Sequence, residues 1–264
     1  MLKKRLIFTL LYSNGQFMLS RNFRLQKVGD IAWLKKNYDF SKIAFSIDEL
    51  IVLDVTRDGK SSSQFCKTLG ELAENCFVPI AAGGGVADIS SARALLRSGA
   101  DKVVVNTALA ESPACIDALA VEFGQQCIVA SVDVKGSGDH ATVFVRSGAQ
   151  VVEQSAKDYL AAITKMPIGE LYLCSIDRDG TGQGLDLALL DLLSREQAQP
   201  VILAGGIGNA SHMARGLEDH RLDAVATAHL FNFVGDGLVR AREGVKEGGI
   251  PLASWDLDIL EGLK

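Results

Sequence analysis

The sequence predicts a single α/β domain, a (β/α)8 TIM barrel built from two similar half-barrels and spanning residues 1–264. Three observations predict it. Short apolar runs alternate with helix-like segments eight times along the chain, and nothing between them has the composition of a linker. Hydrophobic residues make up 48% of the chain but aromatic residues only 6%, which is typical of a buried parallel sheet covered by helices. Motifs of the first half also recur in the second.

Each expected strand is an apolar run that ends in polar or glycine-rich residues. These runs cover residues 5–11, 49–54, 78–82, 102–105, 127–132, 170–174, 201–204 and 224–226. Helices are expected over residues 30–38, 62–75, 88–98, 113–123, 156–163, 187–193, 211–217 and 238–245. Residues 13–22 are expected to form a polar turn followed by irregular chain, and residues 135–154 a hairpin outside the barrel.

The repeat pairs the second expected strand with the sixth. LIVLDVTRDGK, from Leu50, and LYLCSIDRDGTGQG, from Leu171, both leave their strand through Arg-Asp-Gly. PIAAGGGV and PVILAGGI pair the third strand with the seventh, and IVASVD of the fifth then overlays LIFTLL of the first. We therefore expect a duplicated half-barrel.

Composition excludes several classes of function. A net charge of -5 gives no general attraction to nucleic acid or to anionic membranes. No apolar run approaches 18 residues and the chain starts with charge, so neither a membrane span nor a signal peptide is expected. The cysteines are scattered without CxxC spacing, so we expect reduced, mostly buried thiols in a cytoplasmic protein and no zinc site. The histidines lack ligand spacing, which argues against a catalytic metal. The cysteines are Cys66, Cys76, Cys115, Cys127 and Cys174.

Glycine-rich strand exits suggest two anion sites at the barrel mouth. Gly83–Gly85 and Gly205–Gly206 let backbone N–H groups approach an anion, and each lies beside a polar exit of the next strand. Tight turns are the alternative for one such exit, but two in repeat-related positions favour a substrate with a phosphate at each end. The candidate phosphate-binding residues are Gly85, Asn106, Thr107, Asp179, Gly180, Thr181, Gly205, Gly206, Ala228 and His229.

Three aspartates are expected to close strands, namely Asp54, Asp133 and Asp179. Acids in a barrel mouth can exchange protons with a substrate, and the catalytic interpretation is favoured for Asp133. Asp54 and Asp177 are instead expected to bind loop backbone and the nearby arginines Arg57 and Arg178. No Cys or Ser lies in a nucleophile motif.

Charged residues start four of the strands at the opposite end of the barrel. They are Arg5, Glu49, Lys102 and Glu170, two bases and two acids that could form a closed ring of ion pairs at the barrel floor. Such a ring would be an ordinary stabilising device, because floor residues usually serve stability. Alternatively, it is a polar gate through which something small passes.

Several motifs together resemble a known family over nearly the whole chain. KKRLIF, DELIVLD, GGGV, GADKVVVNTA, SIDRDGTGQG and AGGIG are similar to the cyclase subunit of imidazole-glycerol-phosphate synthase. The resemblance implies a lyase-type synthase subunit that takes ammonia from a glutaminase docked on the floor, in a heterodimer, and uses it without a cofactor on a two-phosphate nucleotide. It implies that Arg5, Glu49, Lys102 and Glu170 form the ammonia gate, and that Asp101 contacts the glutaminase.

The chain departs from that family where the chemistry is done. The family's two catalytic aspartates end strands one and five; Asp133 matches the second, but Leu11 stands at the first. Losing one of two acid/base groups typically costs ~10²–10⁴ in rate. The family's mobile-loop lysine falls on Leu19, with Arg21 close by, and His229 stands where the family has Ser.

This combination resembles a branch of paralogues in surface-polysaccharide (O-antigen, lipopolysaccharide) gene clusters. The resemblance implies delivery of ammonia, with a separate ATP-using amidotransferase, for conversion of a sugar acetamido group to acetamidino. One alternative is a genuine histidine-pathway cyclase, yielding imidazole glycerol phosphate and a carboxamide ribotide, in which another group replaces the missing acid. Another is a catalytically silent scaffold that binds a phosphorylated regulator. The sister isomerase is disfavoured, since it needs no floor gate.

Overall fold

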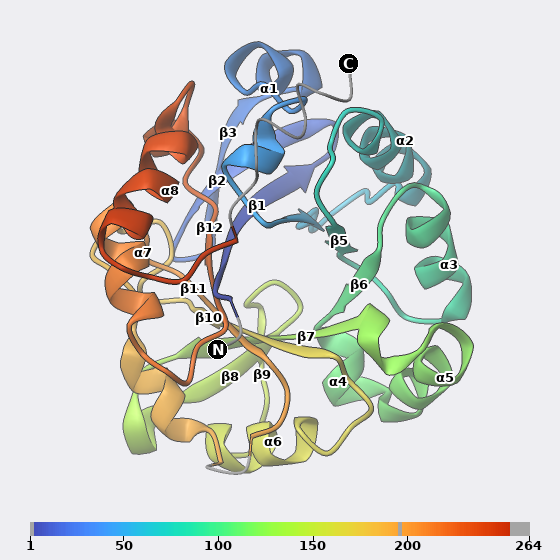
Figure 1. Cartoon of the computed structure of the whole chain (residues 1–264). Coiled ribbons are helices and arrows are strands. Elements are labelled where there is room, and N and C mark those ends of the chain that lie inside the picture. The colour runs from blue at the N-terminus through green and yellow to red at the C-terminus, as the bar shows by residue number, and fades with distance from the viewer. Residues whose placement is uncertain (1–2, 195–196, 254–264) are drawn as a thin grey trace.

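The computed structural model describes residues 3–194 and 197–253, and in it eight parallel strands close into a barrel (Figure 1). Each strand pairs with the next along the chain, and the last pairs with the first. The barrel strands are β1 (Arg5–Ser13), β4 (Glu49–Asp54), β5 (Ile80–Gly83), β6 (Lys102–Val105), β7 (Ile128–Lys135), β10 (Glu170–Ser175), β11 (Val201–Ala204) and β12 (Ala224–Thr227). The predicted (β/α)8 barrel is confirmed.

Helices surround the barrel and bury its outer face (Figure 1). They are α1 (Ile31–Asn37), α2 (Ser62–Ala73), α3 (Ile89–Arg97), α4 (Thr107–Glu111), α5 (Pro113–Phe123), α6 (Ala156–Ile163), α7 (Ala210–Leu217) and α8 (Gly237–Glu247). Polar side chains just before five of them accept a backbone N–H of the first turn, which fixes where each helix begins. These caps are Asp30, Ser61, Asp88, Ser155 and Asn209. No helix of the described ranges is long and apolar enough to cross a membrane.

The helix expected over residues 187–193 is present as a 3-10 helix, Leu187–Leu192. The prediction of mostly buried thiols is wrong, because only Cys76 and Cys174 of the five free cysteines are buried. The other three are partly exposed, on the helices α2 and α5 and in a short 3-10 helix.

Two hairpins extend from repeat-related strands, β1 and β7. The second, β8 (Thr142–Val145) with β9 (Gln150–Val151), was expected. The first, β2 (Gln16–Arg21) with β3 (Arg24–Gly29), lies where irregular chain was expected. Asn14-Gly15 signals only the two-residue loop that joins β1 to β2, and both residues do have positive φ. The turn between β2 and β3 falls at Asn22 and Phe23, which no such dipeptide marks.

Repeat-related glycines confirm the duplication at the level of backbone packing. Gly84 follows β5 with φ +108 and Gly205 follows β11 with φ +95. A Cβ at Gly84 would collide with the carbonyl oxygen of Asp54, and one at Gly205 would lie 2.6 Å from that of Ser175. Asp54 and Ser175 are themselves equivalent ends of β4 and β10. Both half-barrels therefore use the same close approach of loop to strand, which only glycine permits.

Candidate active site at the barrel mouth

A cavity of about 580 Å³ opens at the carboxyl ends of the barrel strands. Most of the residues predicted to bind phosphate line it: Gly85, Asn106, Thr107, Asp179, Gly180, Gly205, Gly206, Ala228 and His229. Thr181 is not among the lining residues, because its hydroxyl turns back and donates to the carbonyl oxygen of Arg178. Within the described ranges, His, Cys, Asp and Glu side chains form no cluster suited to a metal ion.

Asp133 lines this cavity and is partly exposed. It lies within β7, two residues before the strand ends. Asn106 donates from Nδ2 to Asp133 Oδ2 at 3.2 Å and to the carbonyl oxygen of Ser131 at 3.0 Å, so the amide holds the carboxyl group in place. Burial raises the pKa of Asp133 to about 7, with a further contribution from the nearby charge of Asp179. A carboxyl group with such a pKa can both give and take a proton near neutral pH.

Asp179 binds the first hairpin. It lies four residues after the end of β10, and its Oδ2 accepts hydrogen bonds from Ser20 Oγ and from the backbone N–H of Phe23. These bonds oppose the effect of burial, which still raises its pKa. The Asp179 carboxylate therefore anchors the hairpin, while Asp179 and the following Gly180 both line the cavity, and the predicted phosphate contact of Asp179 stays a prediction.

Both Arg-Asp-Gly motifs hold the same hairpin turn. Asp179, of the second motif, accepts from the N–H of Phe23, and Arg57, of the first, donates from Nη2 to the Phe23 carbonyl oxygen at 2.9 Å. Asn22 and Phe23 have φ values of +50 and +62, a conformation that is uncommon for a bulky residue and is maintained only by its surroundings. Arg57 also approaches the carbonyl oxygen of Ser147, in the turn of the second hairpin, at 3.4 Å.

Leu11 faces the cavity from β1, across the barrel from Asp133 on β7. It is 9% exposed, and its neighbour on β4 is Leu53. Positions 11 and 133, where the family resembled has its two catalytic aspartates, thus lie on opposite walls of one cavity, as the repeat predicts. Position 133 presents a carboxyl group to the cavity, and position 11 presents an apolar side chain.

The two glycine exits have different polar neighbours. Beside Gly85, Lys60 reaches over the loop: its Nζ donates to the Asp54 carbonyl oxygen at 3.0 Å and would lie 3.5 Å from a Cβ on Gly85. Beside Gly205 and Gly206 lies His229, whose Nδ1 accepts the N–H of Asn232, which leaves Nε2 to carry the proton of the neutral ring. Burial lowers the pKa of His229.

Sequence reasoning missed three cations that line the cavity: Arg57, Lys60 and Arg146. A signal for the first two was available, since both lie in the exit loop of the β4 strand, TRDGK. Arg146 had none, because its place depends on how the second hairpin folds back: Thr107 Oγ1 accepts its N–H, and its guanidinium pairs with Glu111. All three cations come from the first half-barrel and the second hairpin, so this side of the mouth is the more positive.

Asp54 and Asp177 bind loop backbone, as expected, but not the arginines expected beside them. Asp54 accepts the N–H of Thr56 at 3.0 Å, with Lys60 Nζ 3.7 Å away. Asp177 accepts the N–H of Gly136 at 2.7 Å. The arginines were expected there because they are close in sequence. Instead Arg57 donates to the carbonyl oxygen of Phe23 in the first hairpin, and Arg178 donates to the side-chain oxygen of Gln183 in its own loop.

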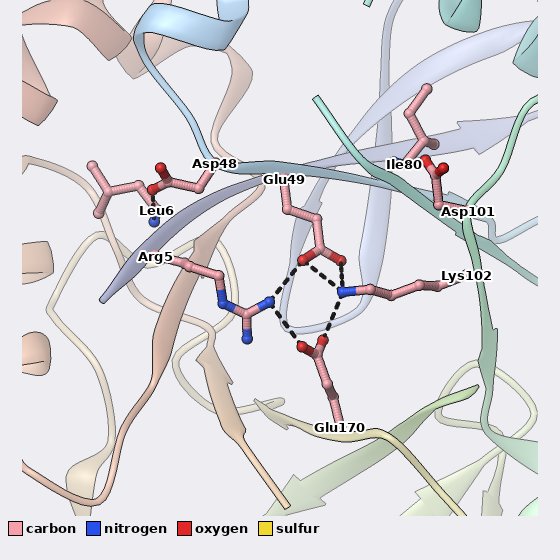
Figure 2. A network of polar contacts seen from close by, with 8 residues as sticks. All are labelled: Arg5, Leu6, Asp48, Glu49, Ile80, Asp101, Lys102 and Glu170. Carbon is pink, nitrogen blue, oxygen red and sulfur yellow. Dashed lines mark hydrogen bonds and ion pairs between the residues drawn. The ribbon is translucent and has the colours of Figure 1, made fainter. Parts of the chain in front are cut away.

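At the barrel floor the four predicted charges form a closed ring (Figure 2). Arg5 Nη1 lies 2.9 Å from Glu49 Oε2 and 2.8 Å from Glu170 Oε1, and Lys102 Nζ lies 3.0 Å and 3.2 Å from the same two carboxylates. Glu49 is only 2% exposed, and burial raises its pKa although both cations oppose that rise. Acids and bases alternate around the barrel axis, so each charge has two opposite neighbours.

Asp101, expected at a partner interface, lies exposed beside this ring and has an internal contact (Figure 2). Its Oδ2 accepts the first N–H of β5, from Ile80, at 2.8 Å. The repeat-related Asp223 accepts the first N–H of β11, from Val201, at 2.9 Å. The carboxylate therefore caps a strand in both half-barrels, and that structural use accounts for an aspartate at this position.

These features define a (β/α)8 barrel protein with a cavity between two glycine-rich strand exits at its mouth and a ring of ion pairs at its floor. The family model described as "Histidine biosynthesis protein" matches residues 22–235. The chain belongs to this family.

Curated relatives narrow the similarity. The chain is 44% identical over 258 residues to the "Putative imidazole glycerol phosphate synthase subunit hisF2" of Parasynechococcus marenigrum (strain WH8102), covering 97% of this chain and 96% of the relative. It is 35% identical over 253 residues to the "Imidazole glycerol phosphate synthase subunit HisF" of Hyphomonas neptunium (strain ATCC 15444), covering 96% and 99%. The resemblance to the cyclase subunit family is confirmed.

Proposed function

We propose that the chain is a cyclase-like subunit that receives ammonia from a glutaminase through the barrel and delivers it to an acceptor other than the histidine-pathway substrate. We propose sugar amidination in surface-polysaccharide synthesis, with a separate ATP-using amidotransferase, as that use. The glutaminase would dock on the floor as a heterodimer partner, over Asp101 and the ring. The relatives are synthase subunits by name, which supports the partner.

The observation that carries this proposal is the combination of an intact ring with an altered mouth. Arg5, Glu49, Lys102 and Glu170 make every ion pair that a closed ring allows. At the mouth, Asp133 is poised to exchange a proton while Leu11 opposite offers only a hydrocarbon wall. Of the two carboxyl groups expected to transfer protons from opposite sides of the cavity, only Asp133 is present. The two glycine-rich exits proposed to bind phosphate are both retained.

A second function, that of a working histidine-pathway cyclase, is favoured by Asp179. Its carboxyl group lies close enough to raise the pKa of Asp133, and it lines the same cavity. Released from Ser20 and Phe23 it could replace the missing strand-one acid.

Turnover of the bisphosphate nucleotide that imidazole glycerol phosphate synthases use, with ammonium chloride as nitrogen source, separates these functions. We expect no turnover by the wild-type chain and a gain with Leu11→Asp, because the carboxyl group would face Asp133 across a cavity that both glycine exits line. Leu11→Asn is the matched control, equal in size and polarity but without a proton to transfer, and it should stay inactive. Turnover by the wild type would establish the second function and contradict the first.

A further inference from the structure

The interior of the barrel is divided into layers of four side chains, each contributed by alternate strands. The pairing registers place Glu49, Lys102 and Glu170 in one layer with Ala224, and Arg5 joins them from below. The next layer towards the mouth is entirely apolar and consists of Ile7, Ala81, Val129 and Ile202. Above it lies a layer of Ile51, Val104, Tyr172 and Ala226.

Tyr172 is the one aromatic side chain that the described barrel strands contribute to this inner cluster. It is 5% exposed, and it lies on β10 two residues above Glu170 of the ring, a rise of about 7 Å along the strand. Tyr172 pairs in register with Ile202 of β11, whereas the other cluster residues of β11 and β12 are small, namely Ala204, Ala224 and Ala226. Tyr172 is thus the largest side chain in this part of the lumen.

The mouth cavity ends at this layer. Tyr172, Val104 and Ala226 line the cavity, whereas no residue of the apolar layer beneath them and none of the floor ring does. Side chains therefore close the lumen between the ring and the mouth, and the largest of them is Tyr172.

Polar groups above the floor begin with Tyr172. Neither the apolar layer nor Ile51, Val104 and Ala226 offers a side-chain hydrogen-bonding group, so the phenol is the first beyond the ring. Burial raises the pKa of Tyr172 well above its ordinary value, so the phenol keeps its proton. Thr9, one layer higher on β1, lies close enough to oppose part of that rise, yet its fully buried Oγ1 forms no hydrogen bond of normal geometry.

We propose that Tyr172 is an internal gate of the barrel: its ring closes the lumen, and its hydroxyl group, with Thr9, is the hydrogen-bonding station for ammonia between the floor ring and the mouth. A small polar molecule that enters the apolar layer loses its hydrogen bonds to the charged groups of the floor ring, which costs free energy. The phenol of Tyr172 offers it a hydrogen-bond donor and acceptor on the mouth side of that layer. This inference rests on the proposed function, since it concerns the route by which glutamine-derived ammonia arrives.

The test compares two nitrogen sources in the complex of the barrel with the glutaminase subunit from the same source. In the Leu11→Asp chain, turnover of the bisphosphate nucleotide is measured with glutamine and with ammonium chloride, which reaches the acceptor from the mouth. Tyr172→Phe keeps the plug and removes the station, so we expect glutamine-fed turnover to fall about 2–10-fold, the effect of one hydrogen bond, while ammonium-fed turnover changes less than about twofold. Tyr12→Phe is the control, because Tyr12 is buried on β1 outside the inner cluster and its hydroxyl already lacks a partner.

The two hypotheses fail in different ways. If Tyr172→Phe keeps the glutamine-to-ammonium ratio of the Tyr12→Phe control, the gate is wrong while ammonia delivery stands. If ammonium chloride supports turnover in these variants but glutamine never does, delivery through the barrel fails. In that case, or if neither nitrogen source supports turnover, xenon-pressurised crystals still decide on the closure: we expect xenon between the floor ring and the mouth in Tyr172→Ala and not in the wild type. Equal occupancy in both would overturn the proposal.

Discussion

Burial of the Asp133 carboxyl group raises its pKa, so its ionised form weakens the fold and Asp133→Asn should stabilise the protein. The pKa of about 7 lies above the ordinary 3.8, which means that the folded state binds the proton more tightly than the unfolded chain. This proton-linked stability is fully present below pH ~4 and is lost as the pH rises through 7. The difference corresponds to at most about 4 kcal/mol once the group is ionised. Because the cavity admits water, we expect about 1–2 kcal/mol at pH 8.

Thermal unfolding of wild type and Asp133→Asn between pH 4 and pH 8 measures this difference. A gain of 1–2 kcal/mol should raise the melting temperature by roughly 2–8 °C at pH 8 for a domain of this size, and by nothing measurable at pH 4. Asp139→Asn is the control, because Asp139 is exposed on the excursion after β7. A melting temperature for Asp133→Asn that is equal to or below wild type at pH 8 would refute the reasoning, since it would mean that the carboxylate is stabilised in place.

Other parts of the molecule give equally specific expectations. Glu49→Gln leaves Arg5 and Lys102 sharing one carboxylate, and breaking a buried ion pair costs ~3–5 kcal/mol. Because Arg5 and Lys102 are 24% and 20% exposed, we expect the free energy of unfolding in urea to fall by about 1–3 kcal/mol. No change would show that the ring does not stabilise the fold. Arg57→Ala should change the free energy of global unfolding by no more than about 1 kcal/mol but speed amide hydrogen exchange in the hairpin of residues 16–29, because it removes the hydrogen bond to Phe23. Unchanged exchange would show that Asp179 alone holds the turn. Phe23→Gly should be less destabilising than Phe23→Ala by roughly 1 kcal/mol in urea unfolding, because glycine adopts the positive φ of this position without strain, and equal losses would contradict the strain.

The barrel could be predicted from the sequence because its signals are local and repeated. Apolar runs at regular spacing gave every barrel strand, and the shared Arg-Asp-Gly and glycine exits gave the duplication. The ring at Arg5, Glu49, Lys102 and Glu170 was predictable for the same reason, since parallel strand starts converge at one end of a barrel.

The mouth was harder to predict because long-range contacts arrange it. Nothing near Asp179 in the sequence indicates that its carboxylate binds Phe23, 156 residues away. The hairpin itself was missed because its strands alternate weakly between polar and apolar residues. Tyr172 looked like one more apolar strand position, since only the closed barrel shows which face of β10 points inward.

The floor ring also makes the two half-barrels unequal in charge. Glu49 and Glu170 occupy equivalent places in the two half-barrels, so the acids obey the internal twofold symmetry. The bases break it, because both come from the first half and the second half has Ala224 where the first has Lys102. A perfectly symmetric floor would accept a docking protein in two orientations half a turn apart. Charge placed on one side would make those two orientations unequal in energy, so the asymmetric floor would favour one orientation of a docking protein over the other.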